Sequence, residues 1–177
     1  MNILGIDLGS IKTGVTYITG DISAPVFKSR LITASDKLPI DERFLEILRT
    51  VTVTIDAQSP ELVVCEYPFN IMGNAKILVE MFGVIHYHCL MFGFPFLPLP
   101  QTKIKKYATG KGTAEKSDIR MQVYKEFGLD LAEDEADSFF IAHFGMSYVY
   151  GTDKQYRQES VDALKAPKKK KGKKKSA

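Results

Sequence analysis

Four acidic residues of this sequence stand where an ordinary surface carboxylate is not expected. Asp7 lies inside the apolar segment "NILGIDLG", and Glu66 lies inside a second one, "ELVVCEYP". Asp134 and Asp137, in "EDEADSFFIAHF", are three residues apart and would share one face of a helix. Singly, each acid could form a turn or complement a helix dipole. Because an unpaired buried carboxylate is costly, the four together indicate a cluster.

The chemistry of such a cluster is that of a divalent cation site. Neighbouring carboxylates repel one another and raise each other's pKa unless a cation neutralises them. Oxygen ligands without Cys or His favour Mg²⁺ or Mn²⁺. The three histidines, His86, His88 and His143, have no partner at ligand spacing, so we expect them to pack in the core or at a subunit surface. The predicted metal ligands are Asp7, Glu66, Asp134 and Asp137.

The segments that must position these acids have the pattern of an α/β domain. Strand-like and helix-like periods alternate along the chain, which predicts a sheet covered by helices. The expected order is three strands in "NILGIDLG", "GVTYIT" and "FKSRLIT", a helix over 39–57, a strand in "ELVVCEYP", a helix over 74–93, a strand in "FPFLPLPQTK", and two helices starting near Ser117 and within 130–135.

Two of these elements allow sharper predictions. The strand with prolines at 95, 98 and 100 should lie at a sheet edge, because proline cannot donate to a ladder. The helix over 74–93 is apolar almost all round, which suggests a homodimer contact, and a charge at Met81 or Ile85 should then yield monomers. Cys65, next to Glu66, should point to the opposite face of its strand and into the core.

Composition places the chain among ordinary globular proteins. Its 177 residues are 45% hydrophobic and 25% charged, as in one domain with a substantial core. No apolar run reaches the roughly 20 residues of a membrane span, and no export signal is visible at the start. Cys65 and Cys89 form no disulfide framework, so the expected location is the cytoplasm.

Charge is unevenly distributed along the sequence. Residues 165–177 hold eight lysines and no acid, and setting these aside leaves 16 of the 24 basic residues against 21 acidic ones. We therefore predict a folded domain over 1–157 and a disordered lysine-rich tail over 158–177 that serves as an arm for polyanions. One basic cluster remains within the domain, in the segment 103–116: Lys103, Lys105, Lys106, Lys111 and Lys116.

The motifs "GIDLGSIKTG", "VVCEYPF", "IKKYATGKGTAEKSD" and "DEADSFFIAH" occur in this order over residues 1–145. In this combination the chain resembles the RuvC-type Holliday junction resolvases, and most of all their small phage-encoded members. The resemblance implies a ribonuclease H-like fold with a five-stranded mixed sheet in the order 3-2-1-4-5. It also implies that the four acids bind metal, that Lys105 and Lys116 contact DNA, and that Phe69 stacks at the junction centre.

The mechanism implied by the resemblance is hydrolysis of a phosphodiester bond with two Mg²⁺ ions, for which Mn²⁺ should substitute. Two ions roughly 4 Å apart would flank the scissile phosphate. Asp7 would bridge them, and Lys116 would meet a non-bridging phosphate oxygen as a catalytic residue. A twofold homodimer would then nick paired strands of a four-way junction, and of other branched DNA.

Two other functions remain open at this stage. A protein that binds branched DNA without cutting it would share the basic segment, although four acids hinder the binding of a polyanion. An ATP phosphotransferase of the actin-like fold would share "GIDLGSIKTG" as a phosphate loop, but such an enzyme needs a second phosphate loop that this sequence lacks. Cleavage of a four-way junction in Mg²⁺ would distinguish all three.

Overall fold

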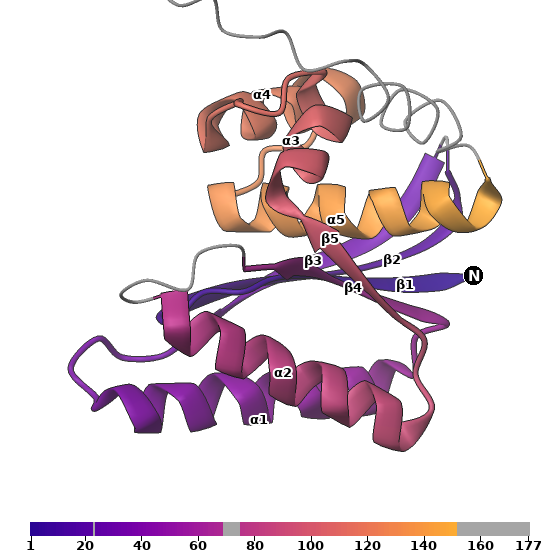
Figure 1. Ribbon diagram of the computed structural model, residues 1–177. Coiled ribbons are helices and arrows are strands. Elements are labelled where there is room, and N and C mark those ends of the chain that lie inside the picture. Colours follow the sequence, from indigo (N-terminus) through magenta and orange to yellow (C-terminus); the bar gives the residue numbers. More distant parts are fainter. Residues whose placement is uncertain (23, 69–74, 152–177) are drawn as a thin grey trace, which may run out of the picture.

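The computed structural model describes residues 1–22, 24–68 and 75–151, which form one five-stranded sheet with helices on both faces (Figure 1). The strand order is β3-β2-β1-β4-β5, as the family resemblance implies. The first three strands are antiparallel neighbours, whereas β4 runs parallel to β1 and β5 runs parallel to β4. The strands are β1 (Asn2–Asp7), β2 (Lys12–Asp21), β3 (Ala24–Thr33), β4 (Leu62–Tyr67) and β5 (Phe96–Pro100).

The central strands are apolar because both of their faces are covered. In β1, Ile3 packs in the core on one face of the sheet, and Leu4 and Ile6 pack in the core on the other. Such strands have continuous apolar runs rather than alternating ones. Strand β5 pairs only with β4, so its Pro98 and Pro100 lie at the sheet edge, as predicted.

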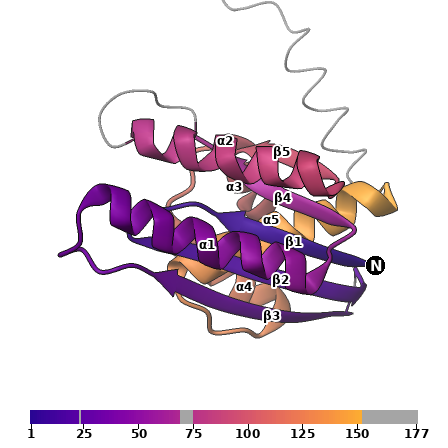
Figure 2. The ribbon, with the colours of Figure 1, turned by 90° about the horizontal axis from the view of Figure 1, so that it is seen from below.

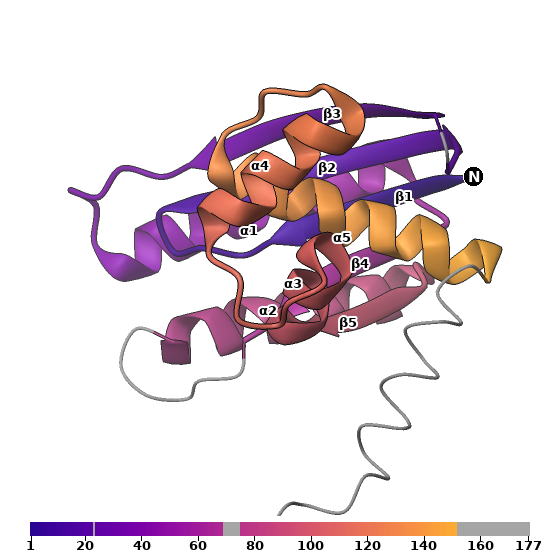
Figure 3. The same cartoon turned by 90° about the horizontal axis from the view of Figure 1, so that it is seen from above.

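Within the described ranges, five helices cover the sheet, two on one face and three on the other. Helices α1 (Ile40–Gln58) and α2 (Ala75–Phe92) lie side by side on one face (Figure 2). On the other face α5 (Glu133–Tyr150) lies over the central strands β1 and β2, and α3 (Gln101–Thr109) and α4 (Lys116–Phe127) pack against it (Figure 3). Because α5 lies between the sheet and these two helices, all of its residues from Ala136 to Ser147 are buried.

Helix α3 is an element that the sequence analysis did not predict. It follows Pro100 directly and ends at Gly110, whose φ of 77° continues no helix. Both residues are ordinary helix boundary signals, but the preceding proline-rich strand and the run of lysines obscured them. As a consequence, the lysines of 103–106 lie on a helix that buries Ile104 and Ala108.

The prediction for α2 was wrong in one respect. Met81 and Ile85 are fully buried in the core between α2, α1 and the sheet, so a charge at either would disrupt the monomer rather than a subunit contact. The helix is apolar all round because a second set of apolar side chains faces outward: Val84, Tyr87, Leu90, Met91 and Phe92.

Some predictions concern residues outside the described ranges. Phe69, the boundary between 157 and 158, and the lysine-rich tail all belong to this group. Within the described residues, no helix has the length and apolar character needed to cross a bilayer.

Candidate active site

Two of the four acids reach the site from adjacent parallel strands. Ile6 of β1 lies opposite Cys65 of β4, and Asp7 and Glu66 are the next residues of the two strands. Ile6 and Cys65 both pack in the core beneath α1 and α2. Since side chains alternate along a strand, Asp7 and Glu66 project toward α5 on the opposite face, and the prediction for Cys65 is confirmed.

The other two acids come from the first turns of α5, which lies unusually close to the sheet. A Cβ atom at Gly14 of β2 would lie 2.0 Å from the carbonyl oxygen of Asp134. A Cβ atom at Gly5 of β1 would lie 2.4 Å from the backbone nitrogen of Ala142. Only glycine leaves room for this approach, so these two positions determine how near Asp134 and Asp137 come to Asp7.

A buried chain of hydroxyl groups fixes α5 along its own axis. Ser138 Oγ donates to the carbonyl of Glu135 at 2.9 Å, so it accepts from Thr16 Oγ1 at 2.8 Å. Thr16 Oγ1 in turn accepts from Ser29 Oγ at 2.7 Å. The chain joins β3, β2 and α5 next to Asp137. The sequence analysis missed Thr16 and Ser138, which are 122 residues apart and carry no local signal of their contact.

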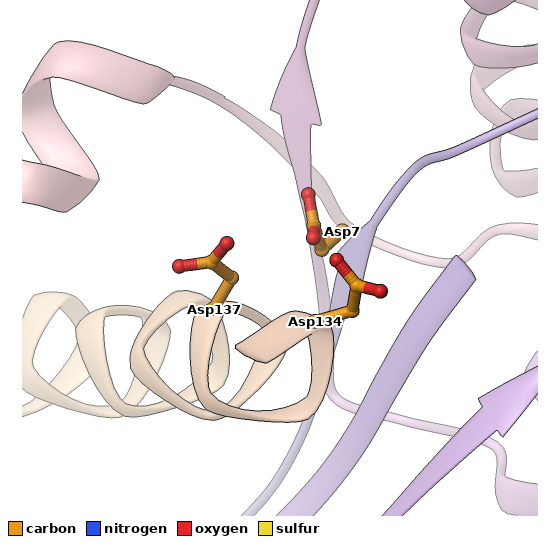
Figure 4. Close-up of side chains that lie close together, drawn as sticks. All are labelled: Asp7, Asp134 and Asp137. Atoms are coloured by element: carbon orange, nitrogen blue, oxygen red, sulfur yellow. The ribbon is translucent and has the colours of Figure 1, made fainter. Parts of the chain in front are cut away.

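Three of the four predicted acids converge on one small space, and Glu66 is not among them. Asp7, Asp134 and Asp137 each place a carboxylate oxygen within 4.8 Å of the others, and Figure 4 shows their side chains directed toward one another. Asp7 and Asp137 are only 8% and 6% exposed. Asp137 Oδ1 is buried and has no hydrogen-bond partner within the described part of the chain. An oxygen-only donor set with an unsatisfied buried oxygen fits a hard divalent cation such as Mg²⁺ or Mn²⁺.

Lys116, at the start of α4, supplies a cation to this space. Its Nζ lies 2.7 Å from Asp134 Oδ1, 3.1 Å from Asp137 Oδ2 and 3.5 Å from Asp7 Oδ2. Burial opposes the charged ammonium, but attraction to Asp7, Asp134 and Asp137 outweighs it and raises the pKa of Lys116. The predicted role of Lys116 was contact with phosphate, whereas here its ammonium contacts the acids.

The carboxyl groups themselves are difficult to ionise. Burial, followed by repulsion from Glu66, raises the pKa of Asp7 well above its ordinary value. Burial and repulsion from Asp137 raise the pKa of Glu66 from 4.5 to about 7, although a side-chain hydrogen bond with Asp7 partly opposes this. Burial also raises the pKa of Asp137, despite the nearby Lys116. A cation that bound here would stabilise the ionised form of all these groups.

The remaining lysines of 103–116 lie in different surroundings. Lys105 on α3 lies near enough to Glu66 and Asp137 to oppose, in small part, the rise in the pKa of both. Lys103 places its Nζ 5.1 Å from the ring centroid of Phe144, so its ammonium contacts α5 rather than the acids. Lys106 is half-buried on α3, and Lys111 is exposed in the connection between α3 and α4.

The three histidines serve packing roles, as predicted. His143 accepts from or donates to the hydroxyl of Tyr107 at 2.7 Å and donates to the carbonyl of Ile22 at 3.3 Å. His88 pairs with Asp56 at 2.8 Å, and His86 stacks on Phe96. None of them belongs to the acidic cluster found among the described residues.

The sheet is mixed and has the order 3-2-1-4-5, with acids at the ends of β1 and β4 and on α5 above them. This arrangement defines a ribonuclease H-like nuclease fold. The family model described as "Crossover junction endodeoxyribonuclease RuvC" matches residues 3–142. The chain therefore belongs to the RuvC family of crossover junction endodeoxyribonucleases.

Individual relatives agree with this assignment. The RuvC of Synechococcus sp. (strain WH7803) is 31% identical over 150 residues, which cover 82% of this chain and 97% of the relative. The RuvC of Gloeobacter violaceus is 30% identical over 151 residues, covering 82% and 87% of the two chains. Among solved structures, Thermus thermophilus RuvC superposes with a TM-score of 0.70 at 23% identity, covering 86% of this chain and 97% of that one. The same protein in complex with a Holliday junction substrate gives a TM-score of 0.71 at 22% identity, covering 84% and 94%.

Proposed function

We propose that this protein is a metal-dependent endonuclease that resolves four-way DNA junctions by paired nicking. The observation that carries the proposal is the buried cluster of Asp7, Asp134 and Asp137, in which Asp137 Oδ1 lacks a partner among the described residues. A protein that only held junction DNA would gain nothing from burying these acids, because they repel phosphate and cost desolvation energy. Membership of the RuvC family supports cleavage as well.

The four acids would hold the metal in distinct ways. Asp7 lies beside both α5 aspartates and is hydrogen-bonded to Glu66, so it would be the central ligand of the set. Glu66, Asp134 and Asp137 would complete the ligand set. Held by these residues, Mg²⁺, or Mn²⁺ in its place, would make water a better nucleophile and would stabilise the charge that develops on the phosphate. Burial raises the pKa of Asp7 and Glu66 in this setting, and a bound cation would favour the ionised form of both.

The DNA contacts would come from the basic side of the site. Lys105 and Lys116 border the acids, and Lys103, Lys106 and Lys111 belong to the same segment. A solved structure contains Thermus thermophilus RuvC in complex with a Holliday junction substrate, and the likeness of its fold supports the same substrate here. Phe69 stays a candidate for stacking at the junction centre, and the lysines of 158–177 for contacts to outlying phosphates. Other branched DNA stays within the proposed substrate range.

Paired nicking requires two sites related by a twofold axis, and α2 offers a surface for a homodimer. Val84, Tyr87, Leu90 and Met91 are exposed apolar side chains on one helix. An apolar patch of this kind is typical of a subunit contact. The proposed location is the cytoplasm of a bacterial cell; the relatives described above are bacterial proteins, and a phage origin stays a prediction.

A nicking assay on an immobile four-way junction tests the proposed function. We expect symmetrical 5′-phosphate nicks in Mg²⁺ or Mn²⁺, none in EDTA, and no requirement for ATP. Binding without cleavage in either metal would favour a junction-binding protein instead. Phosphate release from ATP without any DNA cleavage would favour a phosphotransferase.

A further inference from the structure

We propose that the Lys116 ammonium is an internal cation that holds the acidic cluster together without metal, and that it must leave the carboxylates when a divalent cation binds. The inference rests on the metal site of the proposed function and adds a competitor for that site within the protein. It also explains how Lys116 can contact the acids in this structure and still meet phosphate, which is the role that the family resemblance implies.

The first support is that the ammonium and a metal ion require the same space. Lys116 Nζ lies between 2.7 and 3.5 Å from one oxygen each of Asp134, Asp137 and Asp7. These three residues also form the one group in the described chain that brings potential ligand oxygens within 4.8 Å of one another. A Mg²⁺ ion needs its oxygens at about 2.0–2.1 Å, so it cannot bind among them while the ammonium stays in contact. Repulsion between the two positive charges adds to this exclusion.

The second support is that Lys116 can leave without any change in the fold. Its backbone is held at the start of α4 by a capping box, in which the Glu115 N–H donates to Asp118 Oδ2 at 3.0 Å. The Lys116 side chain, by contrast, is 42% exposed and has four rotatable methylene groups. A change of rotamer would carry the ammonium out of the cluster to its open side. There it could meet the phosphate group of a bound DNA strand.

Replacing Lys116 by Met should therefore have two effects of opposite sign. Without metal, the variant should be less stable than the wild type, because three buried or half-buried carboxylates lose their cation. With metal, the variant should bind Mg²⁺ more tightly, because no ammonium has to be displaced. A residue that merely helped to fold the site, or that helped to hold the metal, would weaken Mg²⁺ binding on removal.

Thermal unfolding of the full chain without DNA, in EDTA and in a titration with MgCl₂, measures both effects. For Lys116→Met we expect a lower melting temperature in EDTA and a Mg²⁺ midpoint at least about tenfold below that of the wild type, because contacts of the ammonium with three carboxylates no longer oppose metal binding. Lys125→Met, an exposed lysine of the same helix, is the matched control and should change neither quantity. A Mg²⁺ midpoint that stays the same or rises in Lys116→Met overturns the inference. Failure of the wild type to bind Mg²⁺ at all would instead overturn the proposed function.

A second measurement uses the wild type alone and does not depend on the stability of a variant. Reductive methylation followed by mass spectrometry reports how accessible each lysine amine is. We expect Lys116 to be methylated slowly in EDTA and faster in saturating Mg²⁺, while Lys125 reacts at the same rate in both. A Lys116 rate that Mg²⁺ leaves unchanged or lowers means that the ammonium stays on the acids, which contradicts the inference.

Discussion

Gly14 controls how closely the acid-bearing end of α5 approaches the sheet, so Gly14→Ala should separate catalysis from folding. The new Cβ would lie 2.0 Å from the Asp134 carbonyl oxygen, against about 3.4 Å for an ordinary contact. Helix α5 and β2 must therefore separate by about 1.4 Å if no other adjustment occurs, since both atoms in the clash belong to rigid elements. Overpacking of this kind costs about 1–3 kcal/mol of folding stability. A shift of about 1 Å in a catalytic group can cost about 100-fold in rate.

The assay is single-turnover nicking of a four-way junction at saturating protein and Mg²⁺, alongside chemical denaturation. Gly145→Ala is the matched control, because Gly145 lies farther along α5. Its new Cβ would crowd Val64 Cγ2 at 2.5 Å and Ile3 Cγ2 at 2.8 Å. Those atoms are methyl groups of side chains and lie away from Asp134, so the control should lose stability but keep most of its cleavage rate. A stable, folded Gly14→Ala protein that cleaves within about tenfold of the wild type would refute the reasoning.

Three further predictions concern other parts of the structure. Glu66→Gln should abolish cleavage. Glu135→Gln should keep its activity and lose at most about 1 kcal/mol of folding free energy in denaturation experiments, because Glu135 Oε2 only accepts a hydrogen bond from the Ala132 N–H at 3.2 Å. An equal loss of cleavage in both variants would refute the assigned register of α5. In EDTA, the free energy of unfolding should fall as pH rises from 4.5 through about 7, because the folded state holds the Glu66 proton more tightly than the unfolded chain does. In Glu66→Gln, the free energy of unfolding should depend less on pH over this range. Tyr87→Asp combined with Leu90→Asp should give folded monomers by sedimentation, whereas Met81→Asp should unfold the chain; a dimeric double variant would exclude this face of α2.

Much of the framework was predictable because it depends on local patterns. The apolar runs around Asp7 and Glu66 are long enough to identify buried strands, and three prolines place the fifth strand at an edge. The spacing of Asp134 and Asp137 places both on one helix face. Each of these inferences needs only a few neighbouring residues.

The parts that the sequence did not reveal depend on contacts between distant segments. The hydroxyl chain through Thr16 and Ser138 joins residues 122 positions apart, and nothing in either neighbourhood announces it. The outward face of α2 could not be told from its inward face, because both are apolar, which is why Met81 and Ile85 were assigned to the wrong surface. The contact of Lys116 with three aspartates likewise required three elements to be placed together.

The most direct test of the metal-dependent nuclease is the Asp7→Asn variant, measured for junction binding and junction cleavage in the same Mg²⁺ buffer. The amide keeps the shape of the side chain but removes the charge at the centre of the cluster, and it reduces repulsion toward phosphate. We expect cleavage to fall by at least about 100-fold, as for the loss of a metal ligand, while binding to the junction is retained or tightened. Cleavage within about tenfold of the wild type, with binding intact, would contradict the assignment of Asp7 and its neighbours as the catalytic metal site.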